Sequence, residues 1–403
     1  MANVSSSNGI GKCPKLRFPG FDEPWEICTA EELFQNVTDK NHPDETVLTI
    51  IQGKGTLPRK QAGRNIHYND ASLSNYKMVH KGDFIIHLRS FEGGLEMANE
   101  NGIVSPAYTI LRGKKPHSSR FYEAYFHTDE FINHVLSKSV EGIRDGRQIS
   151  YDAFKWLGLP YCSPSEQGKI AELFSVLTKR IEKQTELIDS LKKYKRGLIS
   201  EVLKQKLVLS REDEKWEEVS LSDVADGFEY GMNAAATSFD GEHKYIRITD
   251  IDDAAHTYIS SDPVSPSGVL EEKYRVREND ILFARTGASV GKSYLYRKND
   301  GDLFFAGFLI RIHVKDGVDS GYVFLNTLTG EYNKWVLLES ARSGQPGINA
   351  EQYRRYHFKL PSFKTQRYIA EIANNLDMKI YKESQRLLFL QKQKVGLLQQ
   401  LFI

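Results

Sequence analysis

The residues best suited to chemistry lie in a glycine-rich run, Thr286-Gly-Ala-Ser-Val-Gly-Lys-Ser, that follows an apolar segment. The run is similar to a phosphate-binding P-loop, but Thr286 stands where the first glycine of that motif belongs. A P-loop must also open a helix whose N-terminus faces the phosphates, whereas the residues from Tyr294 onward alternate like a strand. Nucleotide hydrolysis is therefore disfavoured. Glycines in such a loop instead allow its backbone to approach DNA closely.

A second polar segment in each half of the chain could recognise DNA bases. Arg144-Asp-Gly-Arg-Gln-Ile-Ser precedes the Leu-Pro pair at 159–160, and Arg342-Ser-Gly-Gln-Pro-Gly-Ile-Asn precedes the Leu-Pro pair at 360–361. Arginine can bind guanine through two hydrogen bonds, and glutamine or asparagine can do the same for adenine. Solvated glycine-rich turns are the alternative explanation.

Other candidate chemistry is weaker. Residues 42–44 (His-Pro-Asp), the strand at 47–51 and residues 52–54 (Gln-Gly-Lys) are similar to a metal-dependent nuclease core with glutamine in place of an acid. An edge strand between polar turns explains them equally well. The chain has no Pro-Pro dipeptide and no HExxH motif, and its eleven histidines show no ligand spacing. We therefore predict no catalytic residue, metal site or cofactor site.

Two long helices must position the loops, because the end of the chain repeats its middle. Ser165-Glu-Gln-Gly-Lys-Ile-Ala-Glu recurs as Lys364-Thr-Gln-Arg-Tyr-Ile-Ala-Glu, at an offset of 199 residues. Apolar residues follow at alternating steps of four and three, as in a coiled-coil seam. These seam residues are Ile170, Phe174, Leu177, Ile181, Ile188, Leu191, Leu198 and Val202, and then Ile369, Ala373, Leu376, Ile380, Leu387, Leu390, Leu397 and Leu401.

The polar interruptions of the seam match between the copies, Gln184 with Glu383 and Lys195 with Lys394. Matched polar residues in a seam typically fix the register of a helix pair. We therefore expect the two helices to pack on each other, antiparallel. The alternative is two independent amphipathic helices, each lying on its own domain.

The segments before the helices also match. Trp25-Glu and Trp216-Glu open them, and both contain strands joined by a polar turn, at Lys81-Gly-Asp and at Glu278-Asn-Asp. Residues 122–135 and 322–336 are each predicted as one helix. The sequence therefore predicts an α+β fold with two α/β domains in a tandem pseudo-repeat, joined by two long antiparallel coiled-coil helices. The expected boundaries are 14–160 and 214–361 for the domains, and 163–208 and 362–403 for the helices.

Composition narrows the class of protein. The 403 residues suffice for two or three domains, and 40% are hydrophobic. Cys13, Cys28 and Cys162 have no CxxC spacing and suggest free thiols in a reducing compartment. The opening residues lack the apolar region of a signal peptide, and the apolar stretch 303–310 is too short to cross a bilayer. We therefore expect a cytoplasmic protein without a membrane partner.

The net charge of +1 conceals a segregation of charge. Residues 50–125 contain eleven Lys/Arg against six Asp/Glu, and residues 273–315 contain nine against four. Because a phosphate backbone responds to local potential, these basic windows favour nucleic-acid binding. Ordinary surface charge is the alternative.

Three features together resemble a known family over essentially the whole chain. They are the opening Pro14-Lys-Leu-Arg-Phe-Pro-Gly-Phe-Asp-Glu-Pro-Trp-Glu, the run Asp280-Ile-Leu-Phe-Ala-Arg-Thr-Gly-Ala-Ser-Val-Gly-Lys, and the doubled Gln-x-x-Ile-Ala helices. The combination is similar to the specificity subunit of type I restriction-modification enzymes. The resemblance implies two target-recognition domains, each recognising one half of an asymmetric bipartite sequence in double-stranded DNA, with the helices as spacer and docking site.

The resemblance further implies a subunit that is not an enzyme by itself and holds no cofactor. Its partners would be two DNA methyltransferase (modification) subunits, which carry S-adenosylmethionine and methylate adenine. Restriction subunits would add translocation and cleavage driven by ATP with Mg. A stand-alone P-loop ATPase or nuclease, and a coiled-coil scaffold without DNA recognition, are the alternatives.

The candidate DNA-binding residues come from the polar loops of both halves. They are Arg247, Arg285, Thr286, Ser289, Lys292, Arg342 and Gln345 in the second domain, and Arg64, His67, Arg89, Arg144, Arg147 and Gln148 in the first. The first domain departs from the pattern, because Glu92 and Glu96 follow Arg89 where the second has neutral or basic residues. The seam spans roughly 50 Å at 1.5 Å per residue, and DNA advances about 34 Å per turn. We therefore expect half-sites about one turn or somewhat more apart.

Overall fold

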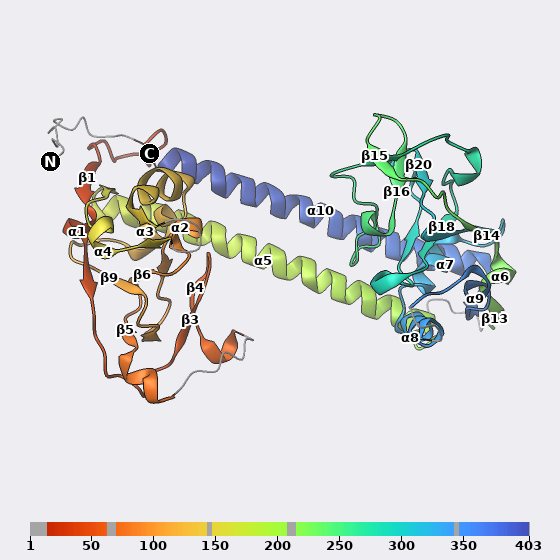
Figure 1. Ribbon diagram of the computed structural model, residues 1–403, viewed down its shortest axis with the longest axis horizontal. Helices are drawn as coiled ribbons and strands as arrows, with labels where there is room; N and C mark the ends of the chain where they lie inside the picture. The colour runs from red at the N-terminus through yellow and green to blue at the C-terminus, as the bar shows by residue number, and fades with distance from the viewer. Residues whose placement is uncertain (1–13, 63–69, 143–146, 208–214, 342–345, 403) are drawn as a thin grey trace. The chain divides into compact units, whose positions relative to one another are not determined.

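The structure, a computed structural model, describes residues 14–62, 70–142, 147–207, 215–341 and 346–402. They form two compact units. Unit 1 extends to Glu186 and resumes at Gln385, and unit 2 comprises Leu187–Ser384. The predicted helices are present as α5 (Pro164–Leu203) and α10 (Phe363–Leu401), the two long helices of Figure 1. The predicted boundaries treated these helices as separate segments, whereas each unit contains part of both.

The two helices pair within each unit, and every predicted seam residue is buried or half-buried. In unit 2, Ile199 shares a core with Ile369, and the Lys195 ammonium donates to Asp377 at 2.6 Å. Because residue numbers rise along α5 as they fall along α10, the segments are antiparallel, as predicted. The alternative of helices that lie apart on their own domains does not describe the structure.

The same antiparallel pairing occurs in unit 1. The ring of Phe174 stacks on that of Phe402 with 6.1 Å between centroids, and the Lys394 ammonium donates to Thr178 Oγ1 at 2.9 Å. Phe402 also packs against the rings of Trp25, Phe121 and Tyr125. Phe402, which directly follows α10, thus completes the core of unit 1.

Unit 1 is built on a four-stranded sheet of order β2-β9-β6-β7 and a separate antiparallel pair, β1 with β12. Its strands are β1 (Glu26–Thr29), β2 (Phe34–Val37), β3 (Leu48–Ile51), β4 (Gly55–Pro58), β5 (Lys77–Val79), β6 (Phe84–Ile86), β7 (Glu96–Met97), β8 (Gly102–Val104), β9 (Thr109–Gly113), β10 (Val140–Glu141), β11 (Gln148–Ile149) and β12 (Gly158–Tyr161). Its short helices are α1 (Ala30–Leu33), α2 (Ser90–Gly93), α3 (Ser119–Phe126) and α4 (Tyr151–Phe154), with a π-helical turn at Glu130–Val135.

Unit 2 repeats this scaffold, with sheet order β14-β21-β18-β19 and the pair β13 with β22. Its strands are β13 (Glu217–Ser220), β14 (Ala225–Tyr230), β15 (Ala236–Ser238), β16 (Lys244–Ile246), β17 (Val264–Pro266), β18 (Asp280–Ala284), β19 (Ser293–Leu295), β20 (Leu303–Phe305), β21 (Leu309–Val314) and β22 (His357–Leu360). Its helices are α6 (Leu221–Val224), α7 (Ser320–Asn326), α8 (Gly330–Ser340) and α9 (Ala350–Arg354). The smaller sheets differ: β5 pairs antiparallel with β8, whereas β16 pairs parallel with β20.

Equivalent buried hydrogen bonds attach the long helix to the sheet domain in each unit. The Gln167 amide accepts from the Ser118 backbone and donates to Cys162 O, at 2.9 and 2.8 Å. Gln366 accepts from the Asp319 backbone at 2.9 Å and donates to Pro361 O at 2.8 Å. The repeated glutamine of the Gln-x-x-Ile-Ala motif therefore anchors each helix. This explains why the motif is present twice.

The prediction of one continuous helix at 122–135 and at 322–336 was wrong, because a threonine interrupts each segment. Thr128 Oγ1 donates a hydrogen bond to Tyr125 O at the end of α3. It also accepts a hydrogen bond from the Phe131 backbone, and this bond caps the next helical turn. Thr329 makes the equivalent pair of hydrogen bonds between α7 and α8. Side-chain hydrogen bonds of this kind replace those of a continuous helix.

Cys28 and Cys162 are buried free thiols, and Cys13 lies outside the described residues. No helix in the described part of the chain is both long enough and apolar enough to cross a membrane.

Candidate nucleic-acid interface

The glycine-rich run of unit 2 lies between two strands of its main sheet. It leaves β18, forms a single 3-10 turn at Gly287–Ser289 and enters β19. The loop therefore opens a strand, whereas a P-loop would open a helix, and the P-loop interpretation is not supported.

The two polar segments predicted in unit 2 meet in the structure. The Ile348 backbone donates to Arg285 O at 2.9 Å, and the Gly287 backbone donates to Pro346 O at 3.2 Å. Thr286 forms a β-bridge with Gly347. Arg342 and Gln345 lie outside the described residues, directly before this contact. The described residues of the two predicted segments therefore lie together in one surface region.

The corresponding segments of unit 1 also meet. Arg89 is the N-cap residue of α2, and the guanidinium of Arg147 lies 4.3 Å from the ring centroid of Phe91 in that helix. Gln148 follows in β11, paired with Glu141. The other three candidates of this domain lie outside the described residues: Arg64, His67 and Arg144. Both units therefore present the same pair of loops at the same end of the sheet.

Strand register refines the sequence comparison between the loops. Ile86 pairs with Thr109 in unit 1, as Phe283 pairs with Ile310 in unit 2. Counting on from these pairs, Arg285 corresponds to Leu88 and not to Arg89. The two loops thus share a backbone frame but present different side chains at each position.

The guanidinium of Arg285 lies near two aromatic rings and forms no ion pair with any of the described residues. Its guanidinium lies 4.9 Å from the ring centroid of Tyr230 and 5.9 Å from that of Phe308. Its Nε is buried without a hydrogen-bond partner among the described residues. Arg247 differs, because both of its bonds, at 2.8 Å, go to the carboxylate of Asp250. Arg285 therefore retains its hydrogen-bonding capacity for a ligand, whereas Arg247 uses much of its own internally.

Both arginines line a cavity of about 610 Å³ on unit 2. Phe308 and Tyr230 stand at this cavity with 61% and 42% of their surfaces exposed. The sequence pattern does not indicate a role for these two aromatic residues. Phe308 lies in the apolar stretch 303–310, which is typical of a buried strand, and nothing in that pattern indicates that its ring is exposed.

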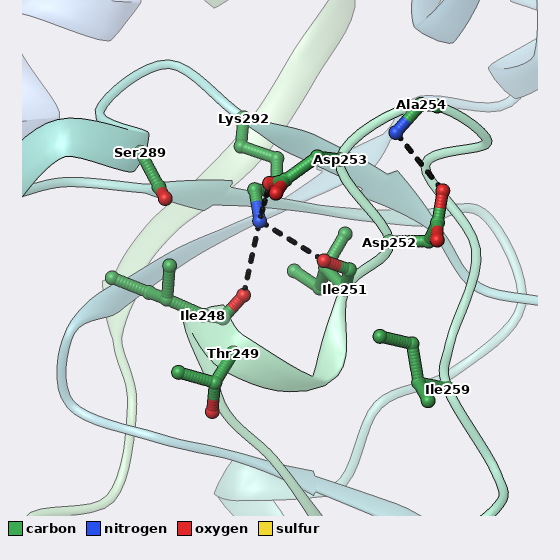
Figure 2. Close-up of a pocket in the computed structure, with 9 residues that line it drawn as sticks. All are labelled: Ile248, Thr249, Ile251, Asp252, Asp253, Ala254, Ile259, Ser289 and Lys292. Atoms are coloured by element: carbon green, nitrogen blue, oxygen red, sulfur yellow. Dashed lines mark hydrogen bonds and ion pairs between the residues drawn. The ribbon is translucent and has the colours of Figure 1, made fainter. Parts of the chain in front are cut away.

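Lys292 is placed differently from Arg285. Its side chain is 9% exposed, and its ammonium donates to Ile248 O at 3.3 Å and to Ile251 O at 3.0 Å while it pairs with Asp253 (Figure 2). Lys292 and Ser289 line a second cavity, of about 390 Å³. The ammonium thus holds the backbone segment behind Arg247. A DNA contact by Lys292 or Ser289 stays a prediction.

Glu96 of unit 1 points into the protein. It is fully buried and accepts hydrogen bonds from the Gly53 and Gly55 backbones, at 2.6 and 2.8 Å, and from His127 at 3.1 Å. Burial opposes ionisation of Glu96, but these hydrogen bonds and the charge of His127 outweigh it, so its pKa lies below the ordinary value. Glu96 therefore stabilises the β3–β4 turn. That turn contains residues 52–54 of the nuclease interpretation.

No group of histidine, cysteine or acidic side chains within the described ranges has the arrangement of a metal site. The nuclease interpretation is not supported.

Comparison with known proteins gives the family. Residues 213–388, which include the sheet of unit 2 and its Arg285 loop, match the type I restriction modification DNA specificity domain. This part of the chain is a type I specificity domain. No curated protein shows significant sequence similarity to this specificity subunit.

Solved structures show that the fold extends beyond the matched domain. A type I restriction-modification S subunit from M. genitalium is 16% identical, with a TM-score of 0.57, over 97% of this chain and 99% of that one. A chain from a structural study of complex assembly and conformational transition of the type I restriction-modification system is 16% identical, with a TM-score of 0.55, over 96% and 99%. At this identity the likeness shows the fold of both units. As a specificity subunit the protein is non-catalytic, and its family implies DNA and partner subunits.

Proposed function

We propose that this specificity subunit recognises an asymmetric bipartite sequence in double-stranded DNA, with each unit recognising one half. One observation supports this proposal: the main sheets of the two units have equivalent strand orders, but the loops that follow β6 and β18 carry different side chains. Arg285 and Thr286 occupy the positions of Leu88 and Arg89. Because bases are distinguished by the side chains that reach their edges, two such loops on one scaffold would recognise two different half-sites.

We further propose that the subunit directs adenine methylation by two modification subunits, which bring S-adenosylmethionine. Restriction subunits with ATP and Mg would cleave DNA that lacks the methyl groups. The match of residues 213–388 to the type I specificity domain supports this assignment. The acting compartment would be the cytoplasm, where these partners meet DNA.

Within each unit, we propose that the paired loops form the DNA-contacting surface. The candidates in unit 2 are Arg247, Arg285, Thr286, Ser289, Lys292, Arg342 and Gln345; those in unit 1 are Arg64, His67, Arg89, Arg144, Arg147 and Gln148. Arg285 is the strongest of them, because it has no internal acceptor among the described residues.

The test is a map of methylated adenines in DNA from cells that contain the modification subunits, with and without this chain. We expect methylation at one sequence of two unlike halves, present only with the chain. Exchanging residues 285–292 for another sequence should change one half and leave the other unaltered. Methylation that is independent of the chain, or a sequence that changes in both halves, contradicts the proposal.

A further inference from the structure

The turn between β20 and β21 holds an exposed aromatic ring on a fixed backbone. Gly307 donates its amide to Met232 O at 2.8 Å, the Leu309 amide donates to Ala306 O at 2.8 Å, and Phe308 O accepts from the Arg285 backbone at 3.1 Å. These bonds connect the turn to two other segments of unit 2. The ring of Phe308 is nevertheless 61% exposed. The apolar ring is therefore available for a contact with a ligand. Because the turn is already held in place, binding adds no entropic cost for ordering it.

The backbone beside this turn leaves no room for a side chain. A Cβ built on Gly231 would lie 2.3 Å from Ala306 O and 2.4 Å from Phe305 O. Glycine is therefore required there for the β14 end and the β20 end to come together. This close approach forms one wall of the cavity of about 610 Å³ and sets the position of Phe308.

The chemistry of the cavity indicates what it contacts. The guanidinium of Arg285, which has no acidic partner among the described residues, lies next to the apolar ring of Phe308. In the major groove, arginine binds guanine or phosphate, and an apolar side chain such as phenylalanine packs against the methyl group of thymine. A positive group and an apolar group side by side thus match the edge of duplex DNA better than an acidic or purely apolar protein surface.

Unit 1 lacks this pair. Its corresponding turn is closed by the same hydrogen bond, from the Tyr108 backbone to Ser105 O at 3.1 Å, and strand register places Ala107 where unit 2 has Phe308. The position of Arg285 is occupied by Leu88. The ring and the guanidinium are therefore found together in unit 2 only, among the described residues, so the contact they make belongs to one half-site.

We propose that Phe308 is a specificity-determining residue that packs against the 5-methyl group of a thymine in the half-site of unit 2, beside the base or phosphate bound by Arg285. This inference rests on the proposed function and deepens it. Tyr230 and Gly231 act through these two residues: the first supports the guanidinium and the second positions the turn.

The experiment uses the full chain in complex with its modification subunits and a duplex that contains the mapped target. Affinity is measured at one fixed salt concentration for the unmodified complex, for Phe308→Ala and for Val269→Ala. Val269 is an 83% exposed apolar residue elsewhere in unit 2, and it is the matched control. In parallel, each thymine of the half-site is replaced in turn by deoxyuridine, which removes the methyl group alone.

We expect Phe308→Ala to weaken binding about ten-fold, and one deoxyuridine replacement to weaken the unmodified complex about four-fold. That replacement should leave the affinity of Phe308→Ala unchanged, because the methyl contact is already lost, and Val269→Ala should bind normally. The proposal is overturned if Phe308→Ala binds as tightly as the unmodified complex, or if the half-site contains no thymine. It is also overturned if the losses from Phe308→Ala and from deoxyuridine are additive at every thymine. Release of the modification subunits by Phe308→Ala would also overturn it, because the ring would then be a protein contact. Failure of the unmodified complex to bind any DNA would instead refute the proposed function.

Discussion

Lys292→Met separates two roles for one lysine. The buried ammonium donates to Ile248 O and Ile251 O, and it also pairs with Asp253, whose side chain is 86% exposed. Hydrogen bonds from a charged donor contribute about 1.5–3 kcal/mol each, whereas an exposed ion-pair partner adds only about 0–1 kcal/mol. Because the bond to Ile248 O at 3.3 Å is long, it should contribute less than the lower value, and we expect the free energy of unfolding of unit 2 to fall by about 2–4 kcal/mol.

The assay is calorimetric unfolding of the full chain, in which such a loss lowers the Tm of a unit of this size by roughly 4–16 °C. Lys298→Met, in the turn after β19, is the matched control, because Lys298 is exposed and its replacement should leave the Tm unchanged. The salt dependence of DNA binding by the complex provides the second measurement. If Lys292→Met leaves the Tm unchanged but reduces the salt slope by about one, the ammonium contacts phosphate and the structural reasoning is refuted.

Four further outcomes are expected. Arg285→Ala should weaken specific DNA binding by about 1–3 kcal/mol and Arg247→Ala by less, since Asp250 already binds Arg247; equal losses in an affinity titration would contradict this. Phe402→Ala should lower the free energy of unfolding of unit 1 by about 3–5 kcal/mol, measured by denaturant titration. Burial lowers the pKa of His127, but the hydrogen bond to Glu96 and the charge of Glu96 outweigh burial and raise this pKa. The His127–Glu96 pair should therefore lose its contribution to stability as pH rises from about 6.5 through the raised pKa of His127. A His127→Gln variant should lack that decline in a plot of Tm against pH. Deleting one heptad from each long helix should shorten the DNA spacing that the complex methylates, and an unchanged spacing would contradict the expectation that the helices set it.

The features predicted correctly from the sequence are those with a local period or a repeat. The seam of α5 and α10 follows from steps of four and three residues, and the constant offset between the copies indicated a duplicated scaffold. The polar turns at 81–83 and 278–280 were also correctly placed, with Gly82 and Asn279 both at positive φ. Each of these signals depends on residues that are close in sequence or exactly repeated.

Two of the three features missed depend on distant partners. Lys292 lies in a basic loop in the sequence, but its acceptors are carbonyls more than forty residues earlier. Threonine caps interrupt the predicted helices without altering their apolar pattern. Phe308 sits in an apolar run, and its ring is exposed because the turn that contains it bonds to Met232 and Arg285. The contacts of Lys292 and Phe308 are not encoded in a window of neighbouring residues, whereas each threonine cap bonds to residues only three positions away.

The discontinuity of unit 1 has a consequence for how the protein is made. Unit 2 is one continuous stretch, Leu187–Ser384, whereas unit 1 needs the segment that begins at Gln385. At roughly 5–20 residues per second, the ribosome makes the last segment on the order of 10–40 s after the first half. Until then Trp25 and Phe121 lack the ring of Phe402 that covers them. The domain synthesised first is therefore the last to be completed, and its exposed aromatic surface is the one that a chaperone would have to protect.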